Sequence, residues 1–285
     1  MTSVPYDDYR VDPATFAGLD SIDQNADGGL TKAEAKPIFK TLNKRVEELQ
    51  EHLYAHGKEK LLFVLQATDT GGKDGTIRAV FDRTNPQGVH IASFKKPTSQ
   101  ELAHDYLWRI HQHTPAAGNI TIFNRSHYED VLVVRVRDIV PEPRWRKRYE
   151  HIRNFEQMLA DEGTTIVKIF LHISKDQQRE RLQARIDEPA KHWKFEFGDL
   201  EERKLWDDYQ AAFGDMVMET STSDAPWYVV PGNRKWYRNI VISQILVDTL
   251  ERMASDDFPP NPELCLLYTS PSPRDQRGSR MPSSA

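Results

Sequence analysis

Residues 61–77 read LLFVLQATDTGGKDGTI, and this stretch decides the fold. Its first five residues form a short apolar run, which predicts a buried parallel strand. A glycine-rich turn with Lys73 follows, and residues 76–81 are compatible with a helix. The N-terminal end of such a helix and the lysine charge both favour an anion, so we predict a phosphate-binding loop. Three glycines remove side chains where backbone N–H groups must close around that anion: Gly71, Gly72 and Gly75.

The loop departs from the pattern GxxxxGK[ST] at two positions. Ala67 replaces the first glycine, and Asp74 follows the lysine where a metal-binding hydroxyl is expected. We expect Asp74 to lie at the phosphates with the rest of the loop, and Thr76 to offer the hydroxyl. Asp69 would repel phosphate unless it holds a divalent cation or orients a nucleophile. An ordinary strand-turn-helix corner is the alternative interpretation of this local pattern.

The composition describes a globular chain. With 285 residues the chain can bury a full core, and one large α/β domain is favoured over two. The hydrophobic fraction is 38%, and no apolar run approaches membrane-spanning length. The N-terminus lacks the basic start and apolar stretch of a signal peptide, so we expect a cytoplasmic protein.

The last 21 residues, 265–285, are set aside as a non-native tail. CLLYTSPSPRD resembles a translated sequencing adapter, and the remainder is polar and of low complexity. Without Cys265 the chain has no cysteine for a disulfide, a metal site or a nucleophile. The tail has three arginines and one aspartate, so the rest of the chain carries −7 rather than −5. An acidic chain is a poor candidate for nucleic-acid binding, and any polyanion must meet a local basic patch.

Strands and helices alternate along the chain. Strands are predicted at residues 61–65, 89–94, 119–123, 165–173 and 227–230. Helices are predicted at residues 37–56, 76–81, 99–113, 144–160, 175–186, 200–213 and 235–253, with another around Val131. We expect Pro37 in a first helical turn, Gly57 as a C-cap, and Ser99 and Ser174 as N-caps. The alternation predicts an α/β fold, a three-layer α/β/α sandwich with a mostly parallel sheet. The domain is expected over residues 31–258, after an N-terminal extension over residues 1–30.

A second polar segment follows the third predicted strand. Ligands bind at the carboxyl ends of parallel strands, so this segment and the phosphate loop should share one edge. Asn124 occupies the position where an aspartate usually helps to hold magnesium. Arg125 can clamp a phosphoryl oxygen, and Glu129 can accept from a base or ribose. A capped helix with a surface ion pair is the alternative.

Further cations are expected near this edge. Lys95 and Lys96 follow the second predicted strand. Other candidates are Arg83, Arg109, Arg135 and Arg137, whereas the run Arg144, Arg146, Lys147, Arg148 is more typical of a solvated helix face.

Residues 187–198, DEPAKHWKFEFG, have the composition of a lid. They contain Lys194 and Trp193, and Arg181 and Arg185 precede them one helical turn apart. Such a segment can close positive charge over a phosphoryl group and exclude water. Packing of Trp193 against the core is the alternative role for that side chain.

Residues 23–34, DQNADGGLTKAE, satisfy the spacing of a calcium loop, from Asp23 to Glu34. The entering segment is too short and polar for a good helix, and no second such loop is present. A capped loop that leads into a helix is therefore the favoured interpretation. The histidines show no zinc-type spacing.

Several segments together resemble the polyphosphate kinase 2 family over about residues 30–255. They are QATDTGGKDGTI, HIASFKKPT, DYLWRIHQH, IFNRSHYEDVLVVRV, DEGTTIVKIFLHISKDQQRERL and APWYVVPGNRKWYRN. The resemblance implies a thymidylate-kinase-like P-loop kinase fold. It implies transfer of the terminal phosphoryl group of inorganic polyphosphate to a nucleotide, with Mg²⁺ or alternatively Mn²⁺. Asn124 with Glu129 resembles the class III members, which accept both AMP and ADP. Dimers or tetramers are also implied.

The same resemblance implies roles for single residues. Asp69 would place magnesium or the attacking nucleotide oxygen, Lys73 would hold the phosphoryl groups, and Arg125 would stabilise the transition state. The lid would act through Arg181 or Arg185 and Lys194, and the polyphosphate would follow Lys95 or Lys96. The nucleotide would be bound by Arg83, Asn124 and Glu129. Ala67 and Thr68 depart from the family pattern, which implies altered packing of the loop.

Two other functions remain open at this level. One is an ATP-dependent nucleoside or nucleotide kinase of the same fold, which differs in its donor. The other is a non-catalytic protein that binds polyphosphate or calcium, which would show no magnesium-dependent turnover.

Overall fold

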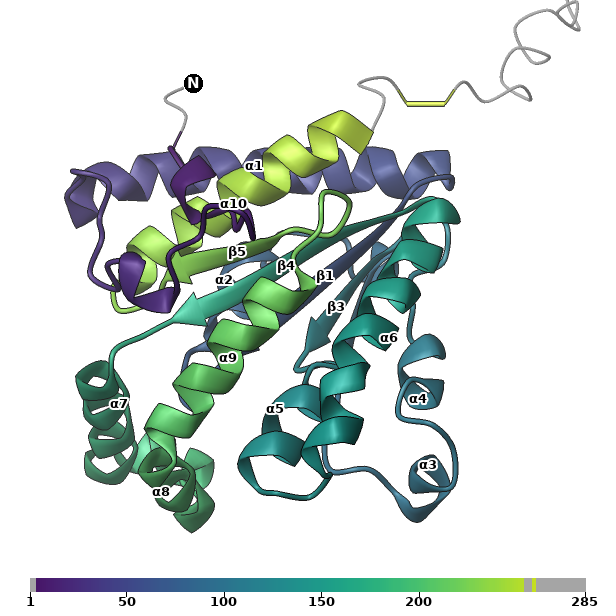
Figure 1. Cartoon of the computed structure of the whole chain (residues 1–285). Coiled ribbons are helices and arrows are strands. Elements are labelled where there is room, and N and C mark those ends of the chain that lie inside the picture. Colours follow the sequence, from purple (N-terminus) through teal and green to yellow (C-terminus); the bar gives the residue numbers. More distant parts are fainter. Residues whose placement is uncertain (1–3, 254–257, 260–285) are drawn as a thin grey trace, which may run out of the picture.

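A five-stranded parallel sheet forms the centre of the molecule. The computed structural model describes residues 4–253 and 258–259 (Figure 1). The strand order is β2-β3-β1-β4-β5, and each neighbouring pair is parallel. The strands are β1 Lys60–Ala67, β2 Val89–Ser93, β3 Ile120–Asn124, β4 Thr164–His172 and β5 Trp227–Pro231. All five predicted strands are confirmed, with ends that move by no more than two residues.

Helices cover both faces of the sheet. One face carries α1 Lys32–His56, α2 Lys73–Val80 and α10 Lys235–Met253, and the other carries α5 Glu129–Val136, α6 Glu142–Asp161 and α9 Trp206–Thr220 (Figure 1). Each face has its own apolar core, around Val46 and Leu246 on the first and Ile152 and Met216 on the second. The inner strands β1 and β4 are buried on both sides, which explains their nearly unbroken apolar runs, whereas the edge strand β2 is largely exposed. The predicted α/β/α sandwich is confirmed.

Four further helices lie in the connections. They are α3 Ser99–Leu102, α4 Trp108–His111, α7 Lys175–Asp187 and α8 Phe197–Lys204. In Figure 1, α7 and α8 lie beyond the carboxyl end of β4. They therefore stand at the edge of the sheet where ligands bind in folds of this kind.

The start of α1 differs from the prediction. The helix begins five residues before Pro37, because Thr31 and Glu34 form a reciprocal capping box at its N-terminus. The capping box satisfies two backbone N–H groups, which offsets the hydrogen bond that Pro37 removes inside the helix. The predicted C-cap is confirmed, since Gly57 has a left-handed conformation with φ of 61°.

The region predicted as one helix over residues 99–113 is two short helices. Thr98, not Ser99, is the N-cap of α3, and it pairs with Glu101 in a second capping box. Asp105 then accepts the backbone N–H of Trp108 and interrupts the helix. Likewise, residues 200–213 are divided between α8 and α9. Ser174 caps α7 as predicted, because its hydroxyl accepts the N–H of Gln177 at 3.1 Å.

The N-terminal segment packs on the sheet. Val4, Val11 and Leu19 are buried, and the Val11 N–H donates to the Trp227 carbonyl at 2.8 Å. The tail over residues 265–285, with Cys265, lies outside the described residues. Among the described helices, none is both long and apolar enough to cross a lipid bilayer.

Candidate active site

The loop between β1 and α2 has the strained, compact form that a phosphate loop requires. Thr70 and Gly72 have left-handed conformations, with φ of 61° and 102°. A Cβ atom on Gly71 would stand 2.5 Å from the Ala67 Cβ and 2.8 Å from the Thr68 carbonyl oxygen. Ala67 therefore packs directly on Gly71. By contrast, a Cβ atom on Gly75 would meet nothing within 4 Å, so the space beside the first turn of α2 is open.

We expect Gly71→Ala to reduce polyphosphate-dependent turnover strongly and to destabilise the fold by about 1–3 kcal/mol, because the added methyl overpacks the loop. Adding Ala67→Gly removes one of the two clashing atoms and should restore part of the loss. Urea unfolding and steady-state rates measure both effects. Gly214→Ala is the control, since nothing lies near that glycine. Wild-type activity and stability in Gly71→Ala would contradict this packing argument.

Lys73 projects from the first residue of α2 into the loop. Its Nζ donates to the Ala67 carbonyl at 3.1 Å. Burial lowers the pKa of Lys73, and the carboxylates of Asp69 and Glu129 oppose that shift. Thr76 does not offer the predicted hydroxyl: it is buried, and its Oγ1 donates to the Gly72 carbonyl at 3.0 Å. Helical geometry points this side chain back along α2 rather than outward.

The ends of β1 and β3 meet as predicted. Arg125 donates from Nη2 to Asp69 Oδ1 at 3.0 Å, and Asn124 donates to Asp74 Oδ1 at 2.8 Å. Arg125 has a left-handed backbone with φ of 62°, which is unusual for a residue other than glycine and typical of functional sites. The structure thus brings Asp69, Asp74, Asn124 and Arg125 together at one edge of the sheet.

Glu129 completes this group from the first residue of α5. Burial raises the pKa of Glu129, while Arg125 and Lys73 act to lower it. Around Arg125, burial favours the neutral form, but Glu129 and Asp69 overcome that effect and raise the pKa of the guanidinium. Two cations and two carboxylates therefore interact across one small volume.

A cavity of about 560 Å³ opens beside these residues, and both charged and apolar side chains line it. The charged and polar lining includes Asp69, Arg125, Glu129, Lys95, Lys96, Arg109 and Arg148. The apolar lining includes Phe94, Leu102, Leu132, Val133, Ile139 and Val140. This volume and this mixture of walls suit a small molecule with an apolar ring and an anionic group.

Sequence reasoning assigned Arg148 wrongly. The charge run predicts a place on the solvated face of α6, but Arg148 is buried, and its Nη1 donates to Asp130 Oδ1 at 3.0 Å at the cavity wall. Its neighbour Arg146 is exposed and pairs with Glu142, as a solvated face would. The spacing along α6 is the signal that separates the two, because Arg148 shares a face with Trp145 and Ile152. Arg109, at 7% exposure, also lines the cavity and donates to the Lys95 carbonyl at 2.9 Å.

The predicted lid residues have separate roles. Arg181 donates to the Gly71 carbonyl at 2.8 Å and to the Gly232 carbonyl at 2.6 Å, so it supports the loop from outside. Arg185 binds the Lys194 carbonyl at 2.9 Å and Asp199 at 2.7 Å, which ties the lid to α8.

Within the lid, Lys194 Nζ lies 5.0 Å from the centre of the Trp193 ring, and Trp193 is 77% exposed. Packing of Trp193 against the core is therefore wrong in this structure. None of these lid residues lines the cavity. The helices on either side of the lid do reach the cavity, through Gln178 of α7 and Glu202 of α8.

One further prediction concerns a residue that lies away from this edge. Arg83 follows α2 and pairs with Glu47 of α1, so it does not line the cavity. One residue that sequence reasoning missed does reach the site: Gln178 is buried and donates to the Asp69 carbonyl at 3.1 Å. An isolated glutamine in α7 gives no signal in the sequence.

The calcium-like loop, residues 23–34, has a structural role. Asp23 and Asp27 each accept a backbone N–H two residues ahead, Asp27 also pairs with Arg234, and Glu34 belongs to the capping box of α1. Within residues 4–253 there is no group of three or more acidic, histidine or cysteine side chains arranged to hold a metal ion.

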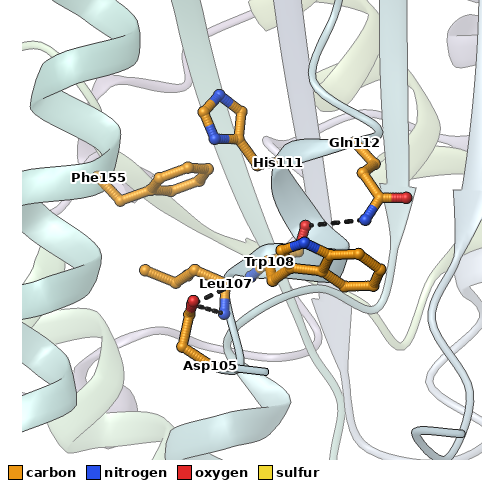
Figure 2. A pocket seen from close by; sticks show the side chains of 6 residues that line it. All are labelled: Asp105, Leu107, Trp108, His111, Gln112 and Phe155. Atoms are coloured by element: carbon orange, nitrogen blue, oxygen red, sulfur yellow. Dashed lines mark hydrogen bonds between the residues drawn. The ribbon is translucent and has the colours of Figure 1, made fainter. Parts of the chain in front are cut away.

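A second cavity, of about 460 Å³, lies between α4 and α6 (Figure 2). It is lined by Asp105, Leu107, Trp108, His111, Gln112 and Phe155. Asp105 already accepts the backbone N–H of Trp108, and Gln112 donates to the Trp108 carbonyl. It contains none of the predicted site residues, so the loop edge remains the candidate active site.

The sequence model of the family described as polyphosphate kinase 2 matches residues 29–257. The chain belongs to the polyphosphate kinase 2 family. Its match spans nearly all of the described residues, including both faces of the sheet, the loop edge and the lid.

Relatives in this family carry more specific names. The chain is 60% identical over 250 residues to an AMP/ADP-polyphosphate phosphotransferase of Meiothermus ruber, covering 86% of this chain and 93% of that one. It is 46% identical over 235 residues to an ADP-polyphosphate phosphotransferase of Rhodopseudomonas palustris, covering 78% and 81%. The crystal structure of polyphosphate kinase 2 from Arthrobacter aurescens TC1 superposes with a TM-score of 0.89 at 42% identity, covering 95% and 99%.

Proposed function

We propose that this chain transfers the terminal phosphoryl group of inorganic polyphosphate directly to AMP and to ADP. The observation that carries the proposal is the single cavity that the Asp69–Arg125 pair and a set of apolar side chains line together. The pocket suits a nucleoside and the loop suits a phosphate chain, so acceptor and donor would meet between them. Relatives named for AMP and ADP support both acceptors.

The metal ligands that the protein offers fit Mg²⁺, or Mn²⁺ in its place, only if the substrate phosphates supply further ligands to the same ion. Asp69 is a half-buried carboxylate in the cavity wall, and no cluster of three such ligands exists among the described residues. Magnesium bound through one or two carboxylates plus substrate phosphates is the usual arrangement in kinases. Asp69 would hold the ion there, and the ion would neutralise charge on the phosphoryl oxygens.

The protein's own residues supply positioning and positive charge. Lys73 and the first-turn N–H groups of α2 would bind the donor phosphates, and Arg125 would neutralise charge that spreads over the transferring group. Glu129 would orient the acceptor beside Asn124. Lys95 and Lys96, in the cavity wall, would bind further phosphates of the donor. Phosphoryl transfer needs no covalent intermediate on the protein when the two substrates are held in line.

Arg185 and Lys194 would act only after lid movement. In the described conformation Arg185 donates to Asp199. The pKa of Asp199 is raised, because burial and the negative charge of Asp69 outweigh the opposite effect of Arg185. The lid therefore stands within electrostatic range of the site. We further propose a cytoplasmic enzyme that forms dimers or tetramers, which light scattering of the purified chain would test.

We expect the chain to convert AMP into ADP and ATP when polyphosphate and Mg²⁺ are supplied, and to stop when EDTA removes the metal. Chromatography of the nucleotides measures both products. ATP in place of polyphosphate should give little ADP from AMP. Efficient transfer from ATP would favour the ordinary nucleotide kinase, and binding of polyphosphate without turnover would favour the non-catalytic protein.

A further inference from the structure

Gln178 occupies one of the two buried positions of α7, and the other is the apolar Leu182. A buried carboxamide costs free energy unless hydrogen bonds satisfy it. Both ends of this one are used: Nε2 donates to the Asp69 carbonyl at 3.1 Å, and Oε1 accepts from Arg203 Nη1 at 2.9 Å. Because a guanidinium can only donate, the amide oxygen must face Arg203 and the amide nitrogen must face Asp69. The side chain of Gln178 therefore links the phosphate loop to α8 in a fixed orientation.

The peptides on both sides of Thr70 are held by α7. Gln178 binds the Asp69 carbonyl, and Arg181 Nη1 binds the carbonyls of Thr70 at 3.2 Å and Gly71 at 2.8 Å. Thr70 lies between the first two of these peptides and has the left-handed φ of 61°. A strained conformation of this kind persists only when its surroundings fix it. Fixing the peptide plane on each side of Thr70 fixes its backbone, so Gln178 supplies one of the two restraints.

Arg203 holds Gln178 from the flank of the lid. It lies in the last turn of α8, and its Nη1 also donates to the Lys175 carbonyl at 2.6 Å. The same turn of α8 is tied to the end of α5, because Arg137 donates from Nη2 to Glu202 Oε1 at 2.6 Å. A displacement of α8 would therefore carry Arg203 away and leave the oxygen of Gln178 without its donor. The position of α8 and the geometry of the phosphate loop are connected through one carboxamide.

We propose that Gln178 is a positioning residue that aligns Asp69 for phosphoryl transfer, and that Arg203 couples this alignment to the position of α8. The inference rests on the proposed function for the reaction itself. Gln178 lies in the cavity wall, but its carboxamide binds the loop backbone and a residue of α8. Asp69 lines the same cavity and pairs with Arg125, so rotation of its peptide would displace the carboxylate from that pair. Misplacement of this size lowers the rate of transfer and leaves most contacts with the bound substrates intact.

Gln178→Met removes both hydrogen bonds and keeps most of the side-chain volume. We expect kcat with AMP and polyphosphate to fall about 10- to 100-fold, while the KM values for both substrates change by less than about twofold. Arg203→Met removes only the link to α8 and should also lower kcat. The double variant should be about as slow as Gln178→Met, because the two side chains act as one unit. Steady-state rates of the four proteins measure this cycle.

Neighbouring residues supply matched controls. Gln177 lies next to Gln178 in α7, and its side chain donates to Glu180. Lys204 lies next to Arg203 in α8 and pairs with Glu201 at the surface. Gln177→Met and Lys204→Met change the same two helices without touching the link, so both should keep wild-type kcat.

Hydrogen exchange tests the same coupling without any substrate. In the free protein, Gln178→Met should speed amide exchange in residues 69–72 several-fold, and Arg203→Met should do so from α8, whereas Lys204→Met should not. Unchanged kcat in Gln178→Met, unchanged exchange in Arg203→Met, or losses that multiply in the double variant would overturn the inference. A raised KM for AMP at wild-type kcat would also overturn it, because Gln178 would then bind the acceptor. If exchange responds as expected but the wild type shows no polyphosphate-dependent turnover, the proposed function fails and the coupling stands.

Discussion

Replacing Lys73 by methionine is expected to lower kcat for polyphosphate-dependent phosphorylation of AMP by about a thousandfold, the scale seen when a positioned charge-stabilising donor is removed. The ammonium group stands inside the loop, 3.1 Å from the Ala67 carbonyl. It interacts with Asp69, Arg125 and Glu129, so it lies where the phosphoryl charge must be neutralised. Methionine keeps most of the side-chain volume and removes only the charge and its hydrogen bonds.

Single-turnover rates with AMP, Mg²⁺ and polyphosphate would measure this loss. Lys147→Met is the matched control, since Lys147 is exposed on α6 and that variant should keep wild-type rates. Circular dichroism would show that Lys73→Met is folded. A folded Lys73→Met with a rate within tenfold of wild type would remove Lys73 from the chemistry and with it the interpretation of the loop.

The strands and the loop could be predicted because their signals are local. An apolar run that ends in a glycine-rich turn needs no distant partner to be recognised, and the same holds for the end of β3 at Asn124 and Arg125. Parallel topology then places both ends at one edge, as the Asp69–Arg125 hydrogen bond confirms.

Residues whose roles depend on distant partners were missed or assigned wrongly. Arg148 appeared as part of a surface run, and only its contact with Asp130 of the preceding helix shows that it is buried. Gln178 reaches Asp69 across more than a hundred residues of sequence. The prediction for Thr76 was wrong for a different, local reason. Its hydroxyl donates to the carbonyl of Gly72, the N-cap of the same helix.

A buried network between β4 and α6 was equally invisible in the sequence. Lys168 Nζ, with no exposed surface, donates to Glu156 Oε2 at 2.6 Å and to the Tyr128 hydroxyl at 3.0 Å. The other oxygen of Glu156 is bound by Tyr128 at 2.6 Å and by His127 at 3.1 Å. Burial alone would raise the pKa of Glu156, but Lys168 and His127 hold it below its ordinary value.

We expect Lys168→Met to destabilise the protein by about 3–5 kcal/mol, because it leaves Glu156 buried without its counter-charge. Adding Glu156→Leu removes the stranded carboxylate and should recover much of that loss. Urea unfolding of the two single variants and the double variant measures the coupling. Lys60→Met is the control, since Lys60 is partly exposed and its ammonium donates to the Glu162 carbonyl rather than to a buried carboxylate; it should cost less than about 1 kcal/mol. A small loss in Lys168→Met, or no recovery in the double variant, would contradict the account.

The same double variant separates stability from activity. His127 and Tyr128 lie between Arg125 and Glu129 in the chain, and both bind Glu156. The network therefore fixes the segment that holds two site residues, one of them in a left-handed conformation. Leucine and methionine can refill the volume but cannot hold that segment by hydrogen bonds, so recovered stability should come with a turnover rate that stays well below wild type. Full recovery of both would show that packing alone positions Arg125 and Glu129.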